Sequence, residues 1–163
     1  MSTRTAYIAL GANLGDPAAT VTEAFAALAE IPQSRVGATS SLYRTAPVGL
    51  RNQPDFINAA ARLDTVLGAE DLLDVLFAIE ARFGRRRSVP NAPRTLDLDL
   101  LLHGDCMVQS PRLTLPHPRL HERAFVLAPL LEIAPEIAIP GRGSAAALLA
   151  ACAGQRIARL EYA

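Results

Sequence analysis

Residues 55–65 are Asp-Phe-Ile-Asn-Ala-Ala-Ala-Arg-Leu-Asp-Thr, and residues 69–83 are Ala-Glu-Asp-Leu-Leu-Asp-Val-Leu-Phe-Ala-Ile-Glu-Ala-Arg-Phe. The first stretch alternates in polarity closely enough to predict a long strand. The second carries apolar residues at helical spacing, which predicts a helix with one buried side. The residues on that buried side are Leu72, Leu73, Leu76, Ile79 and Phe83. The middle of the chain is therefore expected to be a strand followed by a helix.

The segments on either side repeat this order of strand and helix. Asp16 is a suitable N-cap for a helix that begins at Pro17 and stops at Pro32, and a tight turn at 11–15 leads into it. The predicted strands are residues 4–10, 35–44, 55–65, 97–103 and 155–161, and the predicted helices are residues 17–31, 69–83, 121–132 and 144–152. The leading order β-α-β-β-α-β predicts an α+β fold of the ferredoxin-like type. In that fold helices pack on one face of an antiparallel sheet, and the C-terminal elements are additions to it.

The bulk composition describes an ordinary globular protein. The 163 residues suffice for one domain, spanning 1–163, with 50% hydrophobic and 20% charged residues. The formal net charge of zero argues against general affinity for nucleic acid or for an anionic membrane surface. The two cysteines, Cys106 and Cys152, lack Cys-X-X-Cys spacing, and no apolar run is long enough to span a bilayer. We therefore expect a cytoplasmic protein, and we take a monomer as the working expectation.

Every basic residue of the chain is arginine. All 16 are Arg and none is Lys, a bias that genomic base composition can explain. The bias still has a chemical consequence, because any phosphate must be held by guanidinium groups, by His or by backbone N–H groups. It also excludes a P-loop lysine and a Schiff-base lysine.

The strongest local signal for chemistry is the pair Asp97 and Asp99. Strand side chains alternate between faces, so both carboxylates are expected on one face, about 7 Å apart, with Leu98 and Leu100 on the other. Two like charges so placed repel, and a cation between them would relieve the repulsion. Mg²⁺ fits, since it takes one or two carboxylates together with substrate phosphates. A lone Asp-X-Asp is more often a pair of solvated acids, so its neighbours decide between these interpretations.

The neighbours of the acid pair are arginines. Residues 84–87 are Gly-Arg-Arg-Arg and residues 93–95 are Pro-Arg-Thr, and guanidinium groups bind phosphate oxygens in bidentate fashion. A basic run alone is usually a solvated loop, but beside two acids it indicates a site for a polyphosphate and a metal. His117, held between Pro116 and Pro118, is a better candidate for a phosphate contact than His121. The chain contains no dinucleotide or P-loop fingerprint, no Gly-X-Ser-X-Gly and no His-Glu-X-X-His.

Several short segments, in their order and spacing, resemble the 6-hydroxymethyl-7,8-dihydropterin pyrophosphokinases of folate biosynthesis. The resemblance covers nearly the whole chain. The segments are AYIALGANLG (6–15), SLYRTAPVG (41–49), QPDFINA (53–59), IE (79–80), GR (84–85), APRTLDLD (92–99), LPHP (115–118) and RAF (123–125). The resemblance implies a ferredoxin-like enzyme that transfers pyrophosphate from ATP to the pterin hydroxymethyl group, giving AMP and the pterin diphosphate.

The resemblance also implies roles for individual residues. Asp97 and Asp99 would bind two Mg²⁺ ions and, with Arg85 and Arg94, form the catalytic set. The triphosphate would be held by Arg85, Arg87, Arg94, His117 and Arg123, and the adenine would meet the backbone around Leu100. The pterin would stack between Phe56 and Phe125, with Asn58 at its polar edge and backbone groups near Thr45 and Val48 completing recognition. Two aromatic faces suit a flat heteroaromatic ring, and an amide matches an edge that both donates and accepts.

The chain departs from many relatives in one loop, and two other functions stay open. The chain has no Trp, whereas many relatives carry one in the segment that here is Ser-Val-Pro-Asn-Ala (88–92). The loops at 11–17, 46–54 and 84–93 are expected to close over the substrates. The first alternative is a ferredoxin-like module that binds an anion without turnover. The second is an Mg-dependent nucleotidyl or phosphoryl transferase with another acceptor.

Overall fold

The computed structural model describes residues 2–46, 53–84 and 95–160. Its main sheet contains β1 (Arg4–Ala12), β2 (Ser34–Thr39), β3 (Tyr43–Thr45), β4 (Phe56–Thr65), β5 (Asp97–His103) and β10 (Ile157–Arg159). Its helices are α1 (Pro17–Ala29), α2 (Ala69–Arg82), α3 (Ala124–Ile133) and α4 (Ala145–Ala150), with a 3₁₀ turn, η1, at Leu120–Glu122. Two small hairpins complete it, β6 (Val108–Gln109) with β7 (Thr114–Leu115) and β8 (Ala138–Ile139) with β9 (Gly143–Ser144).

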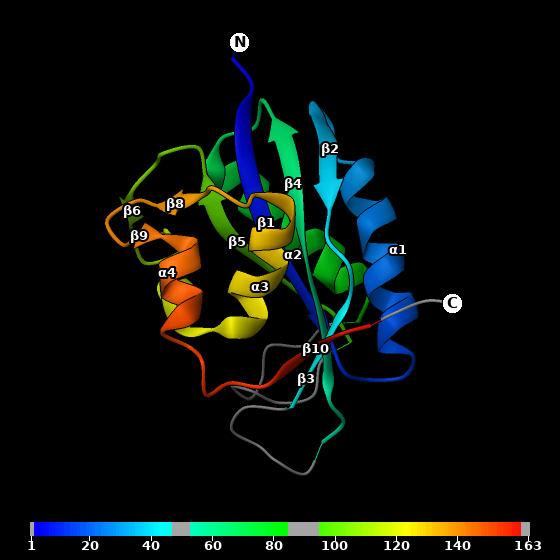
Figure 1. Cartoon of the computed structure of the whole chain (residues 1–163). Helices are drawn as coiled ribbons and strands as arrows, with labels where there is room; N and C mark the ends of the chain where they lie inside the picture. The colour runs from blue at the N-terminus through cyan, green and yellow to red at the C-terminus, as the bar shows by residue number, and fades with distance from the viewer. Residues whose placement is uncertain (1, 47–52, 85–94, 161–163) are drawn as a thin grey trace.

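The sheet is antiparallel, with the strand order β10-β3-β4-β1-β5 and β2 also paired to β4 (Figure 1). The fold is thus α+β with an antiparallel sheet, as predicted, but three strands rather than the predicted two lie between α1 and α2. β1 runs two residues further than expected, through Gly11 and Ala12. The segment at 11–12 is therefore sheet rather than turn, because both residues pair with β4.

The single strand expected over 35–44 was wrong, because the structure contains two strands there. β2 pairs with the C-terminal half of β4 and β3 with its N-terminal half. Between the two strands, the Ser40 side chain replaces a backbone carbonyl as the partner of β4. Ser40 N–H donates to Ala60 O at 2.8 Å, and Ser40 Oγ accepts from Ala60 N at 2.8 Å. A register shift at Gly37 precedes this break. Position 37 has no room for a side chain, because the Arg62 guanidinium occupies the place of a Cβ there.

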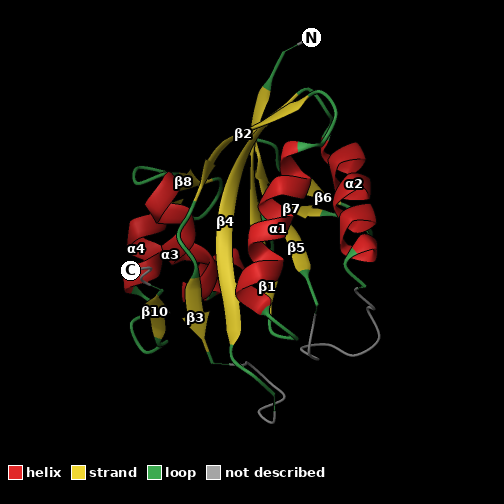
Figure 2. Cartoon of the chain, turned by 90° about the vertical axis from the view of Figure 1, so that its right-hand side faces the viewer, coloured by secondary structure: helices red, strands yellow, loops and turns green. Residues whose placement is uncertain are grey.

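Helices cover both faces of the sheet, which corrects the expectation that they pack on one face (Figure 2). α1 and α2 pack on the face that carries Ile8 and Leu10, and α3 and α4 pack on the face that carries Tyr7 and Ala9. The second face is covered because the strands are apolar on both sides there and α3 is apolar almost all round. The second layer leaves one end of the sheet uncovered by α3, and the candidate site lies at that end.

A register shift lies within β5, opposite Tyr7 and Ile8 of β1. These two residues pair with Leu102 and Leu100, so Leu101 is the extra residue of the strand. Leu98 and Leu100 enter the α1/α2 core, whereas Leu101 and Leu102 enter the α3/α4 core. The shift turns two consecutive residues, Leu101 and Leu102, into the same core, whereas the residues before it alternate between the two faces and so keep both acids on one side.

Glu132 joins α3 to the edge of the sheet. Its carboxylate accepts hydrogen bonds from Tyr43 Oη at 2.6 Å and from Ser41 N at 2.9 and 3.0 Å, and Arg159 of β10 lies 3.8 Å away. Desolvation alone would raise the pKa of Glu132, but the hydrogen bonds from Tyr43 and Ser41 outweigh it and lower that pKa. Burial, followed by the bond to Glu132, raises the pKa of Tyr43 to about 12. Glu132 therefore stabilises the fold as a carboxylate.

Replacing Glu132 is expected to weaken the fold and to change how its stability depends on pH. Glu132→Ala leaves Ser41 N–H and Tyr43 O–H without their acceptor, at a cost of about 1–3 kcal/mol in unfolding free energy. Since the folded pKa lies below the ordinary value of 4.5, the contribution is complete above that pH and is lost as the pH falls through the folded pKa. Urea unfolding at pH 7 and in acid measures both effects, with the exposed Glu136→Ala as control. Equal stability of the two variants at pH 7 would contradict this role.

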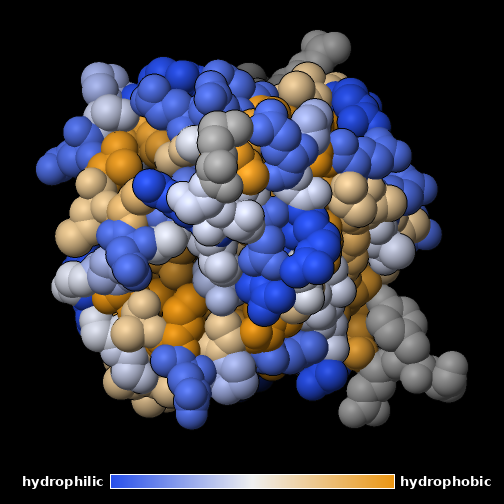
Figure 3. All heavy atoms as spheres, turned by 90° about the horizontal axis from the view of Figure 1, so that it is seen from above, coloured by the Kyte–Doolittle hydropathy of each residue, from blue (hydrophilic) through white to orange (hydrophobic). Residues whose placement is uncertain are grey.

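The surface mixes polar and apolar side chains, as Figure 3 shows for the end of the molecule that carries the N-terminus. Large apolar residues that stand exposed in the described part of the chain are Leu14, Phe77 and Met107. Among the described residues, every helix is too short or too polar to span a bilayer.

Candidate active site

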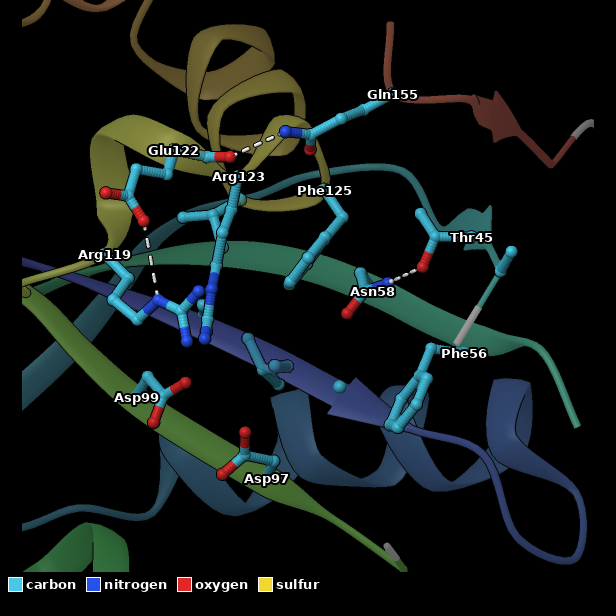
Figure 4. Close-up of a pocket in the computed structure, with 15 residues that line it drawn as sticks. Thr45, Phe56, Asn58, Asp97, Asp99, Arg119, Glu122, Arg123, Phe125 and Gln155 are labelled. Carbon is cyan, nitrogen blue, oxygen red and sulfur yellow. Dashed lines mark hydrogen bonds and ion pairs between the residues drawn. The ribbon is translucent and has the colours of Figure 1, made fainter. Parts of the chain in front are cut away.

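A cavity of about 230 Å³ opens at the end of the sheet opposite the N-terminus, where β1, β3, β4 and β5 meet the start of α3 (Figure 4). The side chains labelled there come from five separate stretches of the chain. They are Thr45, Phe56, Asn58, Asp97, Asp99, Arg119, Glu122, Arg123, Phe125 and Gln155. The rest of the described lining consists of Ala9, Leu10, Gly11, Ala46 and Val126.

The floor of the cavity is one row across three strands. Gly11 of β1 pairs with Asn58 of β4 on one side and with Asp97 of β5 on the other. A Cβ on Gly11 would stand 2.9 Å from Asn58 Oδ1, which is closer than real Cβ contacts. Asn58 Nδ2 donates to Thr45 Oγ1 at 2.8 Å, so the amide is held with its oxygen toward Gly11. The missing side chain at position 11 therefore makes room for the amide of Asn58.

Two aromatic side chains face the cavity from different elements. Phe56 begins β4 and Phe125 lies in the first turn of α3, and in Figure 4 they lie on either side of Asn58. The Arg123 guanidinium carbon stands 5.5 Å from the centre of the Phe125 ring, a cation–π distance. The two rings and the buried amide make an apolar slot with a polar end.

Asp97 and Asp99 point into the same cavity, as predicted (Figure 4). Both are half-buried, whereas Leu98 and Leu100 between and beyond them are buried on the opposite face. Opposite the acids, Arg119 and Arg123 reach in from the segment around η1, and Arg119 Nε lies 3.5 Å from Glu122 Oε2. Among the described residues, no cluster of three or more His, Cys, Asp or Glu side chains could hold a metal. A metal at the acid pair would therefore need ligands from a substrate, which fits the way Mg²⁺ binds through carboxylates and phosphates.

Glu80 supports the acid pair from the other side of β5. Its side chain is 2% exposed, and Oε2 accepts a hydrogen bond from the backbone N–H of Leu98 at 2.7 Å. Leu98 lies between the two aspartates, so α2 holds the backbone of the strand where its acids emerge.

His117 is neutral at physiological pH. Burial, followed by the charge of Arg123, lowers the pKa of His117 to about 4, although Asp97 opposes the shift. Its Nδ1 accepts from Arg119 N at 3.2 Å, so the proton stands on Nε2. His117 lines a separate cavity of about 470 Å³ formed with the two small hairpins, rather than the cavity of the acid pair. In the protein without ligands, the Nε2–H group of His117 is therefore a neutral hydrogen-bond donor.

The structure brings together seven of the residues singled out from the sequence. Those that line the one cavity are Thr45, Phe56, Asn58, Asp97, Asp99, Arg123 and Phe125. The Leu100 side chain is buried in the α1/α2 core, and the adenine contact expected there concerned backbone groups only. Val48, Arg85, Arg87 and Arg94, with the Trp-free segment 88–92, lie outside the described residues.

Reasoning from the sequence missed the other eight described lining residues, four of which bear on the geometry of the site: Gly11, Arg119, Glu122 and Gln155. The sequence predicts a turn at Gly11, and only its position between two paired strands shows that the missing side chain makes room for Asn58. Arg119 and Glu122 carried a weak signal, since they flank His117 and Arg123 in a basic segment. Gln155 carried none.

Comparison with known proteins gives one consistent result. A sequence model of the 7,8-dihydro-6-hydroxymethylpterin-pyrophosphokinase family (HPPK) matches residues 7–135. The chain is 46% identical over 157 residues to the 2-amino-4-hydroxy-6-hydroxymethyldihydropteridine pyrophosphokinase of Pseudomonas aeruginosa, covering 96% of this chain and 97% of that protein. The Haemophilus influenzae protein of the same name is 44% identical over 136 residues, covering 83% of this chain and 85% of that one.

Solved structures with a similar fold include a longer protein. The HPPK-DHPS protein of Plasmodium falciparum superposes with a TM-score of 0.74 over 92% of this chain, at 16% sequence identity. This chain corresponds to 45% of that longer protein, so the likeness concerns the fold of one part of it.

Proposed function

Since the chain belongs to the 7,8-dihydro-6-hydroxymethylpterin-pyrophosphokinase family, and transfers pyrophosphate from ATP to hydroxymethyldihydropterin in folate biosynthesis, we propose that both substrates meet in the cavity above Gly11. One observation carries this proposal. Asn58 and Asp97 are the strand partners of the same glycine, Gly11, so the residue proposed for a flat polar ring and the residue proposed for a metal-bound phosphate lie in one row of the sheet.

The ring half of the site consists of Phe56, Phe125, Asn58 and Thr45. The two aromatic faces stack on the pterin, and the Asn58 amide, held by Thr45, meets its polar edge. An unpaired polar group in such a slot costs about 1–3 kcal/mol, so a ring without the matching edge binds poorly. Val48 belongs to the same half by resemblance.

The phosphate half consists of the acid pair and the cations that face it. Asp97 and Asp99 would hold two Mg²⁺ ions, which neutralise charge on the phosphate oxygens when bound. Arg123 lies across the cavity from the acids and is placed to bind the triphosphate. Arg85, Arg87 and Arg94 are proposed for the triphosphate by resemblance, as are a donor role for His117 and adenine contacts around Leu100.

The reaction needs position and charge neutralisation more than covalent help from the protein. The hydroxymethyl oxygen attacks the β-phosphorus of ATP, and the bond from that phosphorus to the oxygen bridging the α- and β-phosphates breaks. AMP leaves with the bonding electrons, and the hydroxyl proton passes to solvent. The rigid sheet floor holds the ring, and the arginines stabilise the charge that develops on the leaving phosphate.

We also propose the finer features of the protein. A ferredoxin-like plan is supported by the order β5-β1-β4, with β2 and β3 beside β4, and by antiparallel pairing throughout. A single domain over 1–163 is supported by the near-complete coverage of the Pseudomonas aeruginosa relative. A monomer is supported because one chain supplies the described lining, and a reducing, cytoplasmic setting is supported by two unpaired cysteines, Cys106 and Cys152.

Removal of Mg²⁺ is expected to abolish the activity. With ATP and 6-hydroxymethyl-7,8-dihydropterin, the protein should release AMP and pterin diphosphate in equal amounts, and chelation should reduce the rate by at least about 10³-fold, because the phosphates then lose their counter-charge. A coupled assay for AMP with and without Mg²⁺ measures this, and restored Mg²⁺ should restore the rate. An unchanged rate of AMP formation in the presence of the chelator would contradict the role of the metal. If the folded protein formed no AMP, the role assigned to the cavity would be contradicted. An equal rate with another hydroxymethyl acceptor would favour a transferase of broader specificity.

A further inference from the structure

The residue at the N-cap position of α3 does not cap the helix with its own side chain. Arg123 occupies the N-cap and makes no side-chain capping bond there, because a guanidinium has no acceptor to offer. A helix N-terminus leaves backbone N–H groups without partners unless another group accepts from them. The arginine that faces the acid pair thus stands where an Asn, Ser or Asp would stabilise the helix better.

Gln155 supplies the missing cap from 31 residues further along the chain. Its Oε1 accepts from Ala124 N at 2.9 Å, and its Nε2 donates to Glu122 O at 2.7 Å. One amide therefore holds the backbone on both sides of Arg123 (Figure 4 shows the bond to Glu122). Phe125, whose ring lies 5.5 Å from the Arg123 guanidinium, follows directly in the first turn.

The segment that carries Gln155 touches both sides of the cavity. At its start, Cys152 Sγ donates to His121 O at 3.8 Å, beside the same turn. At its end, β10 pairs with β3, with Ile157 opposite Thr45, and Leu160 N donates to Leu42 O at 2.8 Å. Residues 152–160 thus join the start of α3, which bears Arg123 and Phe125, to the strand that bears Thr45. This segment lies beyond the residues 7–135 that the family match covers.

We propose that residues 152–160 form a strap across the cavity and that Gln155 is a positioning residue, which acts by fixing the backbone around Arg123 and so the directions of Arg123 and Phe125. The inference rests on the proposed function, because it assigns the fixed side chains to ATP and pterin. Gln155 contributes geometry rather than chemistry: both of its described hydrogen bonds go to backbone. It would take the place of a local cap and let position 123 be an arginine.

The test compares Gln155→Ala and Gln155→Met, the second of which keeps the length of the side chain and loses both hydrogen bonds. Both should lower kcat/KM by roughly 10- to 50-fold, since a small misplacement of binding groups is costly. The control is Arg156→Gln at the next exposed position, which should change the rate less than about twofold. In an Arg123→Ala background the further loss from Gln155→Ala should shrink to a few-fold, because its main target is gone. An undiminished loss would mean that Gln155 contacts substrate directly and would overturn the positioning role, as would a full rate in Gln155→Met.

A measurement that does not depend on enzyme activity tests the strap independently of the proposed function. Amide exchange at Ala124, followed by NMR, should speed up by about tenfold or more in Gln155→Ala and Gln155→Met, but not in Arg156→Gln. Equal exchange in wild type and Gln155→Met would show that the clamp is absent. If the wild type made no AMP while Ala124 behaved as expected, the clamp would stand and its catalytic purpose would fall with the proposed function.

Discussion

Asp97→Asn is expected to reduce pyrophosphoryl transfer by about 10³-fold or more while the protein stays folded. An amide keeps the shape of the side chain but has no charge for a metal and replaces one acceptor oxygen with a donor. The loss should appear in kcat and as a higher Mg²⁺ concentration for half-maximal rate, because the metal is the group that loses its ligand. The affinity for the pterin should change little, since Asn58, Phe56 and Phe125 are untouched.

Two controls distinguish loss of the metal ligand from a general effect on charge or stability. Asp105→Asn changes an exposed acid just beyond the same strand and should leave the rate within about twofold. The thermal midpoint of Asp97→Asn should stay within a few degrees of wild type, because removing one of two neighbouring like charges relieves repulsion. A folded Asp97→Asn protein with wild-type rate and wild-type Mg²⁺ dependence would contradict the assignment of the acid pair.

Gly11→Ala is expected to lower kcat/KM for the pterin by roughly 30- to 100-fold, although it adds a single methyl group. The new Cβ would stand 2.9 Å from Asn58 Oδ1, so the amide must turn away and its bond to Thr45 must weaken. The edge of the ring then meets a misplaced acceptor. ATP binding should be affected far less, because Arg123 and the acid pair do not depend on that amide. The matched control is Gly68→Ala, where nothing lies within 4 Å of the added carbon.

A double-mutant cycle with Asn58→Ala tests the cause of this loss. Without the amide there is nothing for the new methyl group to displace, so Gly11→Ala should cost less than about threefold in the Asn58→Ala background. Additive losses would mean that the methyl group acts through the strand or against the ring itself, and not through Asn58.

The sequence predicted what depends on short periodicities. Asp97 and Asp99 share a face because strand side chains alternate, and the helix that carries Leu72, Leu76 and Ile79 follows from 3.6-residue spacing. The gathering of Phe56, Asn58 and Phe125 with the acids came from the ordered resemblance, since no local pattern relates residues so far apart.

What could not be predicted depends on contacts between distant residues. The role of Gly11 in making room for Asn58 depends on the register of three strands, which the sequence does not give. From the sequence alone, a glycine just before a helix is explained more simply as part of a turn. The cap from Gln155 crosses 31 residues and lies in an unremarkable polar segment. The break between β2 and β3 depends on Ser40 bonding to Ala60, and the second helical layer depends on which faces of the strands stay apolar after the shift in β5.

A crystal structure of the chain with Mg²⁺, a non-hydrolysable ATP analogue and 6-hydroxymethyl-7,8-dihydropterin would test the proposed site most directly. We expect a ring stacked between Phe56 and Phe125 with its edge at Asn58, metal ions at Asp97 and Asp99, and the hydroxymethyl oxygen in line with the β-phosphorus above Gly11. A ring bound in the cavity beside His117, or metal ions held away from the two aspartates, would contradict it.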